Sequence, residues 1–218
     1  MVRPSPGESP EYEALLRLAA AGEPAAWGAL LTEHEGRLCR MVAFRLDRRL
    51  RGRIDAADVL QEAYSEATDH RLDYFAQPLT PLFLWLRGIV ANKLLETHRH
   101  HLGTRMRDAA REAPAHVGSS PDATSAALID QLSGVATGPG TAAARSEIKV
   151  RLRAALDGME PIDREVLALR HFEQLTNGEA AAVIGIAERA AAKRYVRALK
   201  RLREILAAMP GGLTEVRP

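Results

Sequence analysis

Basic side chains are concentrated near the C-terminus, where residues 188–206 contain seven Lys or Arg against two Glu. On a helix that turns by about 100° per residue, most of these cations fall on one side. Cations on one helix face can neutralise phosphates in a major groove, and Arg can also bond to guanine edges. The pattern predicts nucleic-acid binding, with a solvated surface helix as the simpler alternative. The candidate residues are Arg189, Lys193, Arg197, Lys200 and Arg201, with Arg194 at the margin of the face.

The segment before this basic helix favours DNA binding over mere solvation. Residues 177–184 are predicted to form a short helix, Gly185 interrupts it, and the basic helix follows over about 187–207. A short helix, a turn with glycine and a longer basic helix make a helix-turn-helix pattern. The other side of the basic helix is apolar and can pack on a core.

A second candidate surface is acidic. Asp55 is a good N-cap for a helix over residues 56–69, and Asp58 stands three positions later in a capping-box-like arrangement. Val59, Leu60 and Ala63 would face the core, which leaves Asp58, Gln61 and Glu62 on the outward side. Such a face is either solvated or available to a partner.

A third stretch, predicted to be a helix from about residue 82 towards 107, has Trp85 and Ile89 at helical spacing and a basic end. It also contains His98, His100 and His101, whose spacing is i, i+2 and i, i+3 rather than the i, i+4 that suits zinc. The sequence has one cysteine, no glycine-rich phosphate loop and no nucleophile–base pair. We therefore expect no metal, no cofactor and no enzymatic activity.

Composition predicts an all-α fold, because Ala, Leu, Arg and Glu dominate and aromatic residues are only 5% of the 218 residues. Periodic apolar positions indicate two small helical domains, at 10–112 and 146–209. The stretch between them, 113–145, is mostly Ala, Gly, Pro, Ser and Thr and is expected to be a flexible linker, with a short helix at about 126–132 as an alternative within it. No run of residues has the length and apolarity of a membrane span or a secretion signal, so a cytoplasmic protein that does not bind membranes is expected.

Three motifs in order resemble the sigma-70 family of RNA polymerase sigma factors. Residues 58–64, DVLQEAY, resemble the D-x-x-Q-E-x-[FY] signature of region 2.2. Trp85 to Arg99 resembles the pattern of regions 2.3 and 2.4, and residues 159–206 resemble regions 4.1 and 4.2. With no region 1.1 or region 3 domain recognisable, the layout is similar to the extracytoplasmic-function (ECF) group.

The resemblance implies a factor that binds core polymerase, recognises and opens promoters, and starts transcription. The face with Asp58, Gln61 and Glu62 would bind the clamp of the β′ subunit, and the C-terminal domain would meet the β flap. The last helix would read the −35 element, and the linker would join the two DNA contacts. An anti-sigma factor is a further candidate partner. The residues implied at the −10 element are Trp85, Asn92, Lys93, His98 and Arg99.

Two other functions stay open at this stage. A helix-turn-helix regulator that never joins polymerase would bind DNA but would not use the Asp58 face, whereas a helical adaptor would not need the basic helix. The start of that helix also departs from the family, since Ala187, Glu188, Arg189 and Ala190 stand where many members have Ser or Thr. In the stretch from Leu82 to Arg99, Glu96 stands where the family usually has Asp, and Leu82 stands where it usually has Phe.

Overall fold

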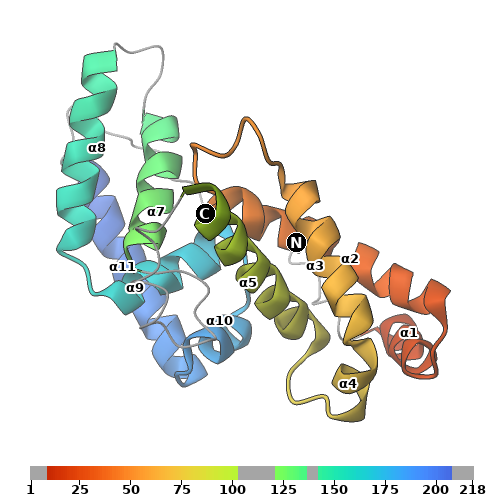
Figure 1. Ribbon diagram of the computed structural model, residues 1–218. Helices are drawn as coiled ribbons and strands as arrows, with labels where there is room; N and C mark the ends of the chain where they lie inside the picture. The colour runs from red at the N-terminus through yellow and green to blue at the C-terminus, as the bar shows by residue number, and fades with distance from the viewer. Residues whose placement is uncertain (1–8, 103–120, 137–141, 208–218) are drawn as a thin grey trace.

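The computed structural model describes residues 9–102, 121–136 and 142–207, and every regular element among them is helical. The all-α prediction is therefore confirmed. None of the helices in these ranges is long and apolar enough to cross a membrane. Figure 1 shows an N-terminal bundle beside a C-terminal group of helices.

The N-terminal bundle is built around a long central helix. Helix α2 (Pro24–Arg45) packs against α1 (Pro10–Ala20), α3 (Ala56–Asp69) and α5 (Leu82–Leu102). Helix α3 begins where the sequence predicts, because the side chains of Asp55 and Asp58 each accept a hydrogen bond from the other residue's backbone N–H. The short helix α4 (Arg71–Ala76) follows α3 directly. Apolar residues of α2, α3 and α5 form the core of the bundle, including Leu30, Leu38, Val59, Leu86 and Leu94.

The C-terminal domain contains the predicted helix-turn-helix. Helices α8 (Ala142–Asp157), α9 (Pro161–Leu167), α10 (Asn177–Ile184) and α11 (Glu188–Ala207) follow one another, with a π-helical turn, η3 (Ala168–Phe172), after α9. Gly185 ends α10 in the left-handed conformation, with φ of 77°, which glycine adopts without steric cost. That turn directs α11 across α9 and α10, and α11 packs on both.

The structure differs from the predicted flexible linker over 113–145. Residues 121–136 form a helix, α7 (Pro121–Ala136), and the first turn of α8 also falls in this stretch. Leu128 is fully buried, and Ile129 and Leu132 are buried beside it against α8 and α9. Packing of these few apolar side chains offsets the entropy of ordering an Ala- and Ser-rich segment. Residues 113–120 and 137–141 of the predicted linker lie outside the described residues.

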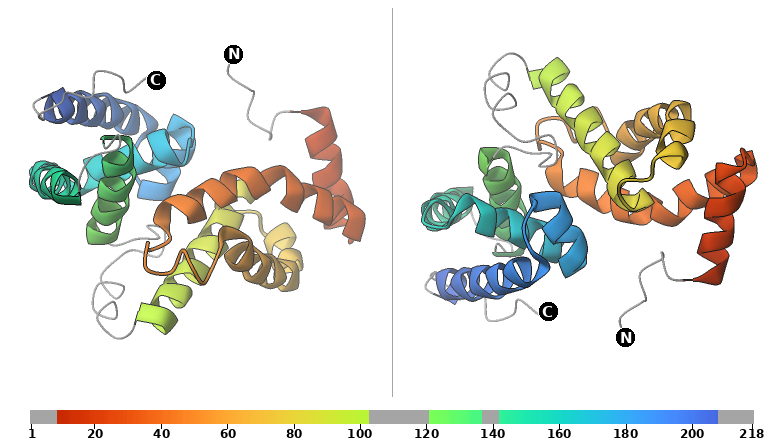
Figure 2. Two further views of the ribbon diagram at one scale, coloured as in Figure 1. Left: turned by 90° about the horizontal axis from the view of Figure 1, so that it is seen from above. Right: turned by 90° about the horizontal axis from the view of Figure 1, so that it is seen from below.

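The two domains share an extensive interface. Helix α2 contacts both α7 and η3, and Figure 2 shows the N-terminal bundle and the C-terminal helices side by side with α2 at the boundary. Leu169, Leu175 and Val183 of the C-terminal domain belong to the same apolar cluster as the core of the bundle. The Phe44 ring stacks on Phe172 with ring centroids 4.9 Å apart. The domains therefore form one packed body.

Candidate functional site

Helix α11 presents its basic side to solvent. Ala191, Ala198 and Leu202 are buried on the opposite side, so the amphipathic pattern that the sequence indicates is present in the fold. A row of cations on an exposed face is available to phosphates. The predicted −35 residues that are exposed are Arg189, Lys193, Arg197, Lys200 and Arg201.

Arg194 differs from the rest of that predicted set. Its guanidinium bonds Glu160 at 2.8 Å and Asp163 at 2.6 Å, both near the start of α9. Its side chain is one-quarter exposed, and hydrogen bonds to the two carboxylates raise its pKa further. These two ion pairs join α11 to the start of α9.

Local bonds fix the geometry of the helix-turn-helix. Thr176 and Glu179 form a reciprocal capping box at the start of α10, with distances of 3.1 and 2.8 Å. The backbone N–H groups of Gly185 and Ile186 both bond to the carbonyl of Ala181 and close the helix. Capping at both ends gives α10 a defined length. The fixed C-terminal end of α10 in turn sets the direction in which α11 begins.

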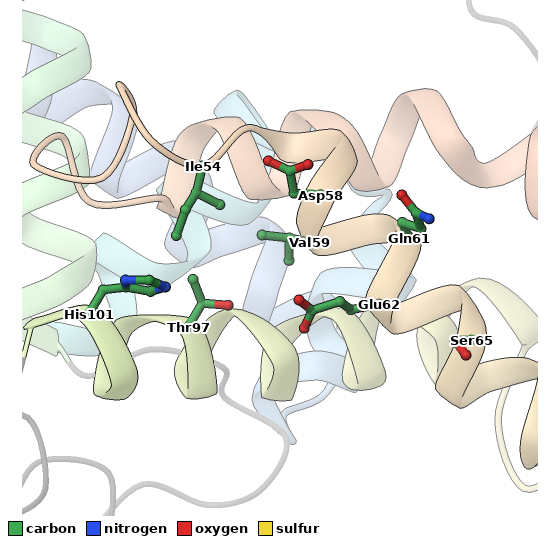
Figure 3. Close-up of a pocket in the computed structure, with 8 residues that line it drawn as sticks. All are labelled: Ile54, Asp58, Val59, Gln61, Glu62, Ser65, Thr97 and His101. Atoms are coloured by element: carbon green, nitrogen blue, oxygen red, sulfur yellow. The ribbon is translucent and has the colours of Figure 1, made fainter.

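The acidic face of α3 lines a pocket between α3 and α5. Figure 3 shows Asp58, Gln61 and Glu62 on α3, with Thr97 and His101 on the neighbouring helix α5. All three predicted polymerase-binding residues are exposed. Asp58 also has a structural task, because its carboxylate accepts the N–H of Asp55 at 3.0 Å. Gln61 and Glu62 are therefore the cleaner probes of binding at this face.

The predicted −10 residues on α5 fall into different environments. Trp85 is half-buried in an aromatic group, with its ring centroid 4.7 Å from Tyr74 and 6.4 Å from Trp27. Asn92 and Arg99 are exposed. Lys93 is ion-paired with Glu66 and Glu96 at 3.4 and 2.9 Å, which holds it along α5.

His98 does not lie on the surface with the other predicted −10 residues. Its side chain is buried, and its Nε2 atom accepts the backbone N–H of Asp47 at 3.2 Å. Burial lowers the pKa of His98, so the ring is neutral when it accepts this bond. His98 therefore anchors the loop after α2. No group of three metal-ligating side chains comes together in the described part of the chain.

Sequence reasoning missed a buried charge cluster at the domain interface. It contains Arg45 of α2 and Arg87 of α5 from one side, and Glu165 of α9 and Glu173 from the other. Nothing in the local sequence distinguishes these residues from surface charges, since more than 80 positions separate the partners in each pair. Only the packing of the two domains brings them together.

Comparison with known proteins identifies the C-terminal domain. Residues 149–202 match the family model described as sigma-70, region 4. Among solved structures, CnrH in complex with the cytosolic domain of CnrY is similar, with 24% identity over 90% of this chain and 97% of that chain and a TM-score of 0.49. No curated protein matches the chain.

Helices α8 to α11 are therefore a sigma-70 region 4 domain, and the resemblance to sigma factors that the sequence indicates is confirmed there. The matched residues include α9, α10 and most of α11, and so the helix-turn-helix.

Proposed function

We propose that this chain is an ECF-type sigma factor that binds core RNA polymerase and directs it to promoters through two DNA-binding surfaces. The observation that carries the proposal is the region 4 match over a helix-turn-helix whose last helix exposes a row of cations. Within that domain, Arg189, Lys193, Arg197, Lys200 and Arg201 contact the −35 element, and α10 supports α11 from behind.

The N-terminal bundle supplies the remaining contacts in this proposal. The pocket between α3 and α5 carries Asp58 and Glu62, and acidic side chains there suit a basic surface on the polymerase clamp. Trp85 stands in an aromatic group, and aromatic side chains can hold an unstacked base at the −10 element. Asn92, Lys93 and Arg99 lie further along the same helix. We leave His98 out of the DNA contacts because it is buried.

Capture of core polymerase tests the proposal against a regulator that never joins polymerase. Tagged wild-type protein should retain core polymerase. The variant Glu62→Arg should weaken retention at least tenfold, because an arginine at this position repels the basic surface of the clamp that the glutamate would attract. Glu33→Arg is the matched control, because Glu33 is also an exposed glutamate in the same domain but lies on α2. It should bind as the wild type does.

Transcription from a promoter that the chain recognises completes the test. Purified chain with core polymerase should produce a defined start, and core polymerase alone should not. If the wild type binds DNA but neither retains core polymerase nor directs a transcription start, the chain is a helix-turn-helix regulator that does not join polymerase. An anti-sigma factor stays a prediction about a further partner.

A further inference from the structure

Helix α11 has one exposed apolar side chain within its row of cations. Val196 is 65% exposed on the outward side of the helix. Arg189 and Arg203 stand seven positions before and after it, which is about two helical turns along nearly the same line. Lys193 and Lys200, three positions before and four after, are its neighbours on the helix surface. All four cations are exposed, so Val196 lies inside the surface that is available to phosphates.

The packing of α11 fixes which of its sides faces outward. Ala198 and Leu202 are each 1% exposed and hold the helix against the rest of the C-terminal domain. Arg194 bonds Asp163 of α9 at 2.6 Å and so restrains rotation of α11 about its axis. Val196 therefore cannot turn inward without breaking these contacts, and its exposed position is a fixed feature of the fold.

Exposure of a single apolar residue is common and carries no meaning by itself. Four other large apolar side chains in the described part of the chain are more than half exposed, namely Leu18, Leu72, Leu79 and Val150, and none of them lies on α11. What distinguishes Val196 is its position among the cations. Since valine is also a weaker helix former than lysine, arginine or alanine, neither packing nor helix propensity explains a valine at this position.

The dimensions of a major groove separate the role of Val196 from that of the cations. Arg189 and Arg203 are about 21 Å apart along the helix axis, at about 1.5 Å per residue. A major groove is about 12 Å wide and about 8.5 Å deep. The long cationic side chains can therefore reach phosphates at the edges of the groove. The short side chain of Val196 can reach only what lies directly against the middle of the helix, which is a base edge.

The chemistry of the base edges selects one partner for a valine. In the major groove guanine, adenine and cytosine present hydrogen-bond donors and acceptors, whereas thymine presents an apolar C5-methyl group beside its O4 atom. Valine has no side-chain donor or acceptor. Against a polar edge it would displace water without replacing the lost hydrogen bonds, which is unfavourable. Against the thymine methyl group it buries apolar surface, which is favourable.

We infer that Val196 recognises a thymine in the DNA element that α11 binds, through van der Waals contact between the valine methyl groups and the C5-methyl group of the base. The assignment of this element to the −35 region depends on the proposed function, whereas the contact itself requires only that α11 enters a major groove. The surrounding cations bind phosphates whatever the sequence. Val196 therefore contributes to selectivity rather than to the electrostatic part of the affinity.

Selection of binding sites from random duplexes identifies the thymine. The full chain is used both with core polymerase and alone. Wild type should enrich a thymine at one position that Val196→Ala no longer enriches, while the preferences at the other positions stay the same. Val150→Ala is the matched control, because Val150 is 66% exposed but lies on α8, and it should select as the wild type does. Circular dichroism should be equal for all three proteins, since both side chains are exposed.

Removal of one methyl group from the DNA then tests the contact directly. Deoxyuridine in place of the selected thymine deletes the C5-methyl group and leaves base pairing unchanged. Wild type and Val150→Ala should bind this duplex about fourfold more weakly, the effect expected for one buried carbon. Val196→Ala should bind the two duplexes equally. Its slope of log affinity against log salt should equal that of the wild type, because no charge has been removed.

The outcomes separate this inference from the proposed function. The thymine contact is wrong if wild type binds the deoxyuridine and thymine duplexes equally, or if Val196→Ala selects the same thymine. It is also wrong if Val196→Ala loses retention of core polymerase and keeps its sequence preference, since Val196 would then contact protein. If the chain alone selects a thymine-dependent site but does not retain core polymerase, the proposed function fails and the contact stands. Absence of any selected site in both forms would overturn both.

Discussion

Replacing Leu128 by alanine tests whether the Ala- and Ser-rich stretch between the domains is folded. Leu128 is 0% exposed in the middle of α7 and packs with residues of α8 and α9. Losing its three outer carbons removes about 2.4 kcal/mol of burial, at about 0.8 kcal/mol per carbon. The cavity left behind brings the expected loss to about 3 kcal/mol.

Urea denaturation followed by circular dichroism measures this loss. With an m-value of about 3 kcal/mol per molar urea, the midpoint should fall by about 1 M while the slope stays the same. Leu72→Ala is the matched control, because Leu72 is 59% exposed on α4, and it should change stability by less than about 0.5 kcal/mol. An equally small effect of Leu128→Ala would refute the reasoning and return residues 121–136 to the flexible linker that composition predicts.

Three further changes have defined outcomes. Asp55→Ala removes the cap of α3 and should lower stability in thermal melts by about 1 kcal/mol. Burial lowers the pKa of His34 from 6.5 to about 4, so the unfolded state binds the extra proton as pH falls through that window. The free energy of unfolding, measured by urea denaturation, should therefore fall by roughly 3 kcal/mol between pH 6.5 and 4. The variant His34→Gln should lose less over the same range. Lys193→Gln should lower the slope of log affinity against log salt for promoter DNA by about 0.9, whereas Arg194→Gln, already paired with two carboxylates, should leave that slope unchanged.

Opposite results would count against each argument. Unchanged melting of Asp55→Ala would mean that α3 is fixed by packing alone. If His34→Gln has the same pH dependence as wild type, other groups cause the acid sensitivity. Equal salt slopes for Lys193→Gln and wild type would move the DNA contact away from this side of α11.

Local signals were enough to predict the bounds of α3 and α10. Asp55 with Asp58, and Gly185 after Ile184, are chemical start and stop signals that act within a few residues, and the observed helices begin and end there. The apolar side of α11 is equally local, because a helix period fixes which residues share a face. The short helix α4 carries no such signal, since no side chain caps its first turn.

The sequence by itself determined the helical fold, the helix-turn-helix and the basic face of α11, because each depends on neighbours within one or two helical turns. Tertiary structure decided what no local pattern contains. In the folded chain His98 is buried and accepts the N–H of Asp47, and Arg194 pairs with Asp163 of α9. Helix α7 packs its apolar residues on α8 and α9. Tertiary structure also joined Arg45 and Arg87 to Glu173 across the domain boundary. The local sequence around a charged side chain is the same whether that side chain contacts solvent, DNA or an opposite charge. Only the packing of the helices brings a partner that is distant in sequence within bonding distance.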